Sequence, residues 1–148
     1  MRCEEIMKRE LACVFPEDTV QTAASLLRAR KVGFLPVCNG ELGVLGTLTD
    51  RDIAIRVVAE GKSATTLVEE VMSNDCVSCR PEDDLQIAER LMADHQVSRI
   101  MCTDGDERLV GVISLSDIAQ HEMSGRASET LRQVSSREAS IEQAEPGI

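Results

Sequence analysis

Two stretches of the chain place a hydroxyl and a carboxylate three residues apart, directly after a run of apolar residues. They read GTLTDRD at residues 46–52 and GVISLSD at residues 111–117. At a strand-to-helix turn, a Ser or Thr followed three residues later by an acid forms a capping box, which stabilises a helix by about 1 kcal/mol. The same hydroxyl, carboxylate and backbone N–H groups suit phosphate oxygens and vicinal ribose hydroxyls. Each motif therefore predicts a helix cap. The same groups can also form a ligand site, because the two roles are compatible.

The two motifs belong to two copies of a longer repeat. A shift of 65 positions aligns residues 4–61 with residues 69–126 without a gap, at roughly 15 identical positions. The identities cluster in the openings EEIM and EEVM, in the shared PED, and in the shared DIA that begins with the last residue of each motif. The chain is therefore predicted to duplicate one supersecondary unit.

Each copy shows the signals of a β-α-β-β-α unit. Acidic residues after Pro16 and Pro81 favour a helix start, and apolar residues then recur at three- and four-residue spacing. Turn dipeptides follow, each between two β-rich runs, as in hairpins. The expected strands and second helices are 12–15, 34–38, 42–48 and 50–60 in the first copy, and 77–80, 99–103, 109–114 and 115–123 in the second.

These elements predict an α/β (α+β) fold with two repeats packed sheet to sheet and related by a pseudo-two-fold axis. The expected divisions are residues 1–65 for repeat 1 with its linker, 66–124 for repeat 2, and 125–148 for a flexible or loosely helical tail. A ligand is expected in the cleft between the repeats.

Charge and composition exclude several classes of protein. The formal net charge is −10, and residues 66–126 carry five Lys or Arg against thirteen Asp or Glu, which disfavours nucleic acid as a partner. No apolar run has the length of a membrane span, and no signal-peptide core opens the sequence, so a cytoplasmic location is expected.

Six cysteines and two histidines provide little further chemistry. The CVSC spacing at residues 76–79 lacks a second knuckle or a histidine pair, so no metal site is predicted and the thiols are expected to be free. His95 and His121 do not assemble a catalytic set with the available nucleophiles. No catalytic residue, and hence no enzyme activity, is predicted.

With its repeated β-α-β-β-α pattern, its EEIM and EEVM openings, its LPV strand at residues 35–37 and its two strand-to-helix motifs, the chain resembles tandem CBS domains over residues 1 to about 124. The resemblance implies a regulatory module that binds an adenosine-containing ligand (AMP, ADP, ATP or S-adenosylmethionine), needs no covalent cofactor, often forms a homodimer, and acts on a partner protein. The alternative is a ligand-free scaffold for protein interaction or dimerisation, in which the motifs only cap helices.

Carried over position by position, the resemblance assigns a nucleotide site to this chain. The two motif aspartates would bind ribose, the motif hydroxyls and nearby arginines would contact sugar and phosphate, and strand residues would line the adenine slot. Met101 departs from the proline usual in the family, and Cys13 and Ser78 from the usual threonine, which leaves the pocket shape open. The assigned residues are Asp52, Asp117, Thr49, Ser114, Ser116, Arg51, Arg99, Leu35, Pro36, Ile100, Met101, Cys13 and Ser78.

Overall fold

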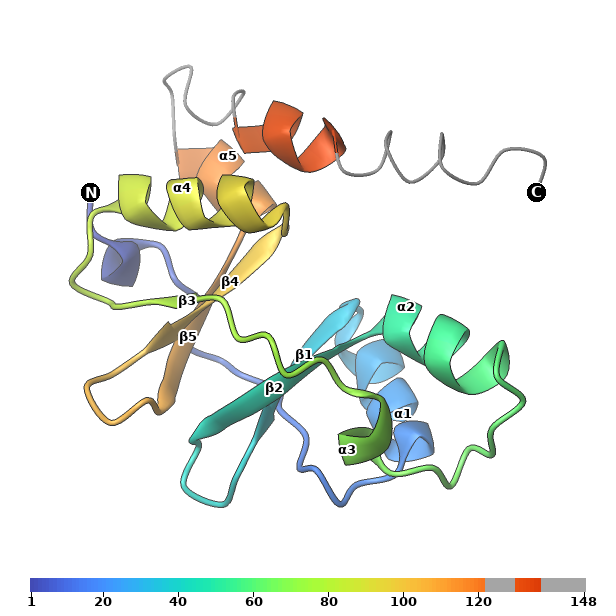
Figure 1. Ribbon diagram of the computed structural model, residues 1–148. Coiled ribbons are helices and arrows are strands. Elements are labelled where there is room, and N and C mark those ends of the chain that lie inside the picture. Colours follow the sequence, from blue (N-terminus) through green and yellow to red (C-terminus); the bar gives the residue numbers. More distant parts are fainter. Residues whose placement is uncertain (122–129, 137–148) are drawn as a thin grey trace. The chain divides into compact units, whose positions relative to one another are not determined.

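A computed structural model of the chain describes residues 1–121 and 130–136 (Figure 1). The chain divides into two compact units. The first-repeat unit consists of Glu10–Cys76 with Gly105–Leu109, and the second-repeat unit consists of Met1–Arg9, Val77–Asp104 and the described residues from Val110 onward. The units therefore cross the boundaries of the sequence repeats.

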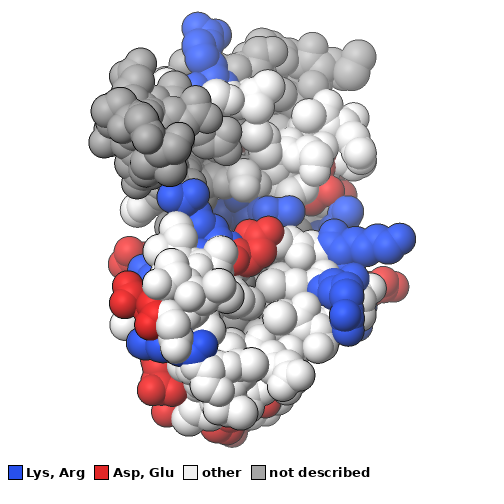
Figure 2. All heavy atoms as spheres, turned by 90° about the vertical axis from the view of Figure 1, so that its right-hand side faces the viewer, with Lys and Arg blue, Asp and Glu red and all other residues white. Residues whose placement is uncertain are grey.

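The first-repeat unit contains one hairpin and its helices. Strands β1 (Phe34–Cys38) and β2 (Val44–Thr49) pair antiparallel, with Leu35 opposite Leu48. The helices are α1 (Val20–Arg30), α2 (Asp50–Ile53), the π-helical segment η2 (Ala54–Val58) and α3 (Val68–Val71). Thr19 caps α1 by accepting from the N–H of Thr22, and Lys31 ends it in the left-handed region with φ 56°. On the face in view in Figure 2, Lys and Arg side chains are interspersed with Asp and Glu side chains.

The second-repeat unit contains a three-stranded sheet in the order β3-β4-β5. Its elements are η1 (Cys3–Glu5), β3 (Ser78–Cys79), α4 (Leu85–His95), β4 (Arg99–Thr103), β5 (Leu109–Ser114) and α5 (Leu115–His121), followed by helical residues 130–136. Asp84 caps α4 by accepting from the N–H of Gln86, and Gln96 ends it at φ 53°. The caps and ends of α1 and α4 therefore correspond under the 65-residue shift.

The opening segments of the two repeats are exchanged between the units. In the second-repeat unit, Cys3 N–H donates to the carbonyl of Asp83 at 2.9 Å, and Leu85 N–H donates to the carbonyl of Met1 at 2.8 Å. In the first-repeat unit, the equivalent bonds join Val68 to Asp18 and Val20 to Thr66, each at 2.8 Å. Each opening segment thus satisfies backbone groups of the other repeat, because a buried N–H or C=O requires a partner.

Each unit has its own apolar core. Helix α1 buries Val20, Ala23 and Leu27 against the hairpin, whereas Ala24, which also fits the three- and four-residue spacing of the sequence, is exposed. The corresponding face of α4 buries its apolar residues in the second core: Leu85, Ala88 and Met92. The core of the first-repeat unit is aliphatic, whereas the second core also contains Cys and Met side chains, and within the described residues neither core contains a buried aromatic residue.

Most expected elements are present, with differences at their ends. The strand expected at 12–15 is reduced to a single parallel bridge between Val14 and Val37. The helix expected at 50–60 changes from α to π geometry after Ile53, and the expected tail falls mostly outside the described residues. Among the described residues, no helix is both long and apolar enough to cross a membrane.

Candidate functional site

The first motif forms a complete capping box at the junction of β2 and α2. Asp52 N–H donates to Thr49 Oγ1 at 3.1 Å, and Thr49 N–H donates to Asp52 Oδ2 at 2.9 Å. A cap is favoured at this junction because the first N–H groups of a helix have no hydrogen-bond partners within the helix. One carboxylate oxygen of Asp52 therefore accepts the cap hydrogen bond, and the other oxygen can contact a second partner.

The second motif has the same geometry at the junction of β5 and α5. Asp117 N–H donates to Ser114 Oγ at 3.1 Å, and Ser114 N–H donates to Asp117 Oδ2 at 2.9 Å. Ser114 Oγ also lies 2.9 Å from Ser116 Oγ. Two sequences that differ at several positions thus produce one arrangement twice.

The glycine that begins each motif permits a close approach by the exchanged segment. Thr47 and Ser73 exchange both backbone hydrogen bonds at 2.9 Å beside Gly46, and Val112 and Lys8 do the same at 3.1 and 2.9 Å beside Gly111. A Cβ on Gly46 would collide with the carbonyl oxygen of Ser73, and one on Gly111 would lie 2.5 Å from Met7 Sδ. The glycines therefore position the exchanged segments beside the motifs.

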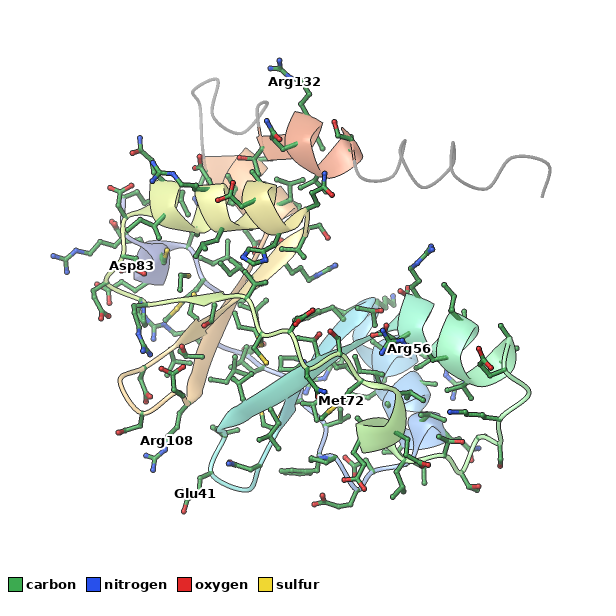
Figure 3. All side chains as sticks on the ribbon, viewed as in Figure 1. Glu41, Arg56, Met72, Asp83, Arg108 and Arg132 are labelled. Atoms are coloured by element: carbon green, nitrogen blue, oxygen red, sulfur yellow. The ribbon has the colours of Figure 1, made fainter. Side chains whose placement is uncertain are left out.

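The second oxygen of each motif aspartate faces a cation. Lys8 Nζ lies 3.4 Å from Asp117 Oδ1, and Arg56 Nε lies 3.9 Å from Asp52 Oδ1. Arg56, labelled in Figure 3, also donates from Nη1 to the carbonyls of Val71 and Met72 at 3.2 and 3.3 Å. Arg56 is thus held on the backbone of the exchanged segment, whereas the Lys8 side chain is 72% exposed.

The structure distributes the other expected site residues between the two units. Leu35 and Ile100 are fully buried in the two cores, and their strand neighbours Pro36 and Met101 are also buried but belong to neither core cluster. The remaining residues are accessible to different degrees: Cys13, Ser78 and Arg99 are half-buried, and Arg51 and Ser116 are exposed. Leu35 and Ile100 are therefore enclosed in the two cores, with exposed fractions of 0% and 1%.

The arrangement provides hydrogen-bonding groups and charges for binding. Each motif offers a carboxylate oxygen, a helix N-terminus and a nearby cation, a set that suits hydroxyl donors and phosphate. Within residues 1–121 and 130–136, no group of three or more His, Cys, Asp or Glu side chains has an arrangement that could hold a metal ion.

Comparison with known proteins identifies the class. The family model for the CBS domain matches residues 3–59 and 68–124. The CBS domain-containing protein YhcV of Bacillus subtilis is 44% identical over 126 residues, which cover 84% of this chain and 88% of YhcV. This chain belongs to the CBS-domain family, whose paired domains are regulatory ligand-binding modules.

Solved structures share the fold. Hypoxic Response Protein I, whose crystal structure contains two coordinated zinc ions, has a TM-score of 0.74 and 32% identity over 82% of this chain and 98% of that one. In sequence, Hypoxic response protein 1 of Mycobacterium tuberculosis is 32% identical to this chain, over 79% of this chain and 82% of that protein. The CBS domain pair of MJ0100, in complex with 5-methylthioadenosine and S-adenosyl-L-methionine, has a TM-score of 0.74 over 82% and 98% of the two chains at 20% identity.

Two charged residues of the site were missed in the sequence. Arg56 follows Asp52 by four residues on the same helical run, a spacing that predicts an ion pair. Lys8 gives no such signal, because its partner Asp117 lies in the other repeat and the contact depends on the exchange of opening segments.

Proposed function

We propose that this chain is a regulatory module that binds an adenosine-containing nucleotide (AMP, ADP, ATP or S-adenosylmethionine) at its strand-to-helix motifs and changes the activity of a partner protein. The observation that supports the proposal most is the repeated geometry of Asp52 and Asp117, whose Oδ2 atoms accept from the cap while Oδ1 faces a cation.

The geometry suits a ribose because each carboxylate has an oxygen that the helix cap does not use. Vicinal hydroxyls can donate to Oδ1 of Asp117, and the Lys8 ammonium can pair with a phosphate, because its side chain is largely exposed and flexible. Asp52 is paired with Arg56, which the backbone already holds, so its second oxygen is less available. We therefore expect Asp117 to contribute more to nucleotide affinity than Asp52.

Calorimetric titration of the full chain with AMP, ADP, ATP and S-adenosylmethionine tests the proposal, with GTP as the control. We expect Asp117→Asn to weaken binding about 10- to 100-fold, because a hydrogen bond to a charged group contributes about 1.5–3 kcal/mol. Asn keeps the size of the side chain and an oxygen that can accept from the cap, so loss of binding would report the lost charge.

Matched controls come from two other aspartates. Asp18 Oδ2 accepts from Phe15 N–H at 2.8 Å, and Asp83 Oδ2 accepts from Arg80 N–H at 2.9 Å, so each forms the same kind of local bond outside the motifs. Asp18→Asn and Asp83→Asn should leave the affinity unchanged. Equal affinities for wild type and Asp117→Asn, or no binding of any adenosine compound, would contradict the proposal.

A second candidate function, a ligand-free interaction module, is supported by exposed apolar residues on η2. Val58 is 71% exposed and Ile55 is 45% exposed, although Val57 between them is buried. We propose that these side chains contact a second copy of the chain. Sedimentation of Val58→Asp should show dissociation of a wild-type dimer, while the same change at Val32, an exposed residue between α1 and β1, should not. A monomeric wild type would contradict this second function.

A further inference from the structure

Three buried thiols meet in the core of the second-repeat unit. Cys79 Sγ donates to Cys3 Sγ at 3.7 Å, and Cys79 Sγ lies 3.6 Å from Cys102 Sγ. All three cysteines are free and buried, and they come from η1, β3 and β4 respectively. We call Cys3, Cys79 and Cys102 the thiol cluster.

The first-repeat unit shows that the fold does not require these sulfurs. The 65-residue shift places Val68, Val14 and Val37 at the positions of Cys3, Cys79 and Cys102. All three valines are buried in the first core, and Val14 bridges Val37 as Cys79 pairs with Cys102. Valine therefore fills the same packing role, so the sulfurs add a chemistry that the duplicated core lacks.

Geometry selects one pair within the thiol cluster. Cys79 and Cys102 are register partners on adjacent parallel strands, whose side chains point the same way and whose backbones lie about 4.8 Å apart. A disulfide requires Cβ atoms about 3.5–4.5 Å apart, so this pair would distort a hydrogen-bonded ladder. Cys3 lies outside the sheet on η1, so a bond between Cys3 and Cys79 leaves the pairing of β3 with β4 in place.

We propose that Cys3 and Cys79 are a redox modification site, which forms a reversible disulfide with a low-molecular-weight disulfide as oxidant. The Cys79 thiolate attacks the oxidant, breaks its S–S bond and releases one small thiol. The Cys3 thiolate then attacks the Cys79 sulfur of the mixed disulfide and releases the second small thiol. Two protein thiols are oxidised, one small disulfide is reduced to two thiols, and the two protons pass to the released thiolates.

The first step requires the segment Met1–Arg9 to move away from the unit. In the docked state the hydrogen bond with Cys102, together with burial, raises the pKa of Cys79 to about 12, although the hydrogen bond with Cys3 acts in the opposite direction. A protonated, buried thiol is a poor nucleophile. Once closed, the disulfide would hold the whole segment in place, including Lys8 beside Asp117.

Peptide mapping of the intact chain tests the assignment directly. The reduced protein is incubated with oxidised glutathione, its free thiols are alkylated, and it is digested without reductant for mass spectrometry. We expect a peptide pair that joins Cys3 to Cys79, lighter by two hydrogens than its reduced components and opened by dithiothreitol. The unfolding temperature of the oxidised protein should rise, because the crosslink spans 76 positions of the unfolded chain.

Valine substitutions provide the controls, because valine occupies these positions in the first core. Cys102→Val should keep the Cys3–Cys79 crosslink, and Cys3→Val and Cys79→Val should lose the rise in unfolding temperature. Crosslinks confined to Cys79 and Cys102, or to Cys13 and Cys38 in the first-repeat unit, would overturn the assignment. Full recovery of alkylated Cys3 after oxidation would also overturn it, and this result is read from the wild-type chain whether or not a variant folds.

Discussion

Lys8 and Asp117 form an ion pair between the two sequence repeats, yet both residues lie within one compact unit. The ammonium lies 3.4 Å from Oδ1 of a carboxylate side chain that is only 8% exposed, while the Lys8 side chain is 72% exposed. The pair arises because the opening segment of repeat 1 docks on repeat 2. The exchange of opening segments therefore brings a cation, Lys8, to the candidate site at Asp117.

We expect Lys8→Met to lower the free energy of unfolding by about 1 kcal/mol, because it leaves a nearly buried carboxylate without its cation. Urea denaturation measures the loss, which should shrink as ionic strength rises. Arg9→Met removes the same charge from the adjacent exposed position and should cost less. Equal losses for the two variants at every salt concentration would show that the pair contributes no specific stability.

The contribution of the two cap hydroxyls to stability can be compared between the units. Thr49→Ala and Ser114→Ala should each cost about 1 kcal/mol, because each removes the acceptor of a bond measured at 3.1 Å. Ser116→Ala serves as the control, since Ser116 contacts Ser114 without capping the helix, and we expect it to cost clearly less. Thermal unfolding of the three variants gives the ranking, and an equal cost for Ser116→Ala would argue against the cap as the origin of the effect.

Gly46 and Gly111 are equivalent in sequence but should respond differently to a methyl group. A Cβ on Gly46 meets the backbone oxygen of Ser73, which is held by two backbone hydrogen bonds with Thr47, whereas a Cβ on Gly111 meets the flexible side chain of Met7. We expect Gly46→Ala to cost about 1–3 kcal/mol and Gly111→Ala to cost less. Gly40→Ala, with no atom within 4 Å of the added Cβ, should be nearly neutral.

A double-mutant cycle separates the two causes. Met7→Ala should relieve part of the cost of Gly111→Ala, whereas Met72→Ala should leave most of the cost of Gly46→Ala, because the obstacle there is backbone. Additive effects at Gly111 and Met7 would contradict the contact.

The repeat and its caps were predictable from sequence because they depend on local spacing. Hairpins follow from turn dipeptides between β-rich runs, and Thr49 and Ser114 are recognisable as caps from the acid three residues later. The exchange of opening segments was not predictable. The 65-residue shift aligns Lys8 with Ser73, but this alignment does not indicate which repeat each opening segment contacts. The change to π geometry at Ala54 also carries no residue signal such as Pro or Gly.

The candidate site shows the same division between local and tertiary information. Asp52 and Asp117 could be selected from the motif alone, because the cap bonds act over three residues. Leu35 and Ile100, which the resemblance places in an adenine slot, belong to the two cores, because strand alternation points both side chains there. Their role toward a ligand stays a prediction. Which face of a strand points into the core depends on tertiary packing. A short strand with apolar residues on both faces gives no sequence signal of that choice.

The thiols should make stability fall at alkaline pH. Burial raises the pKa of Cys38 to about 12, and the hydrogen bond with Cys102, together with burial, does so for Cys79. Between the ordinary thiol pKa of about 9 and that value, the folded state keeps a proton that the unfolded state has released, so the free energy of unfolding decreases as pH rises. Below the ordinary pKa both states are protonated and the contribution is constant.

Substitution of the whole thiol cluster by valine isolates its share of this pH dependence. With reductant present, the free energy of unfolding from urea titrations between about pH 8 and about pH 11 should fall less steeply for the variant carrying Cys3→Val, Cys79→Val and Cys102→Val than for wild type. Cys38→Val should remove a separate part of the slope, because Cys38 lies in the other unit. Superimposable profiles for wild type and the triple variant would mean that the clustered thiols titrate alike in the folded and unfolded chain, and that the buried sulfurs act only as packing.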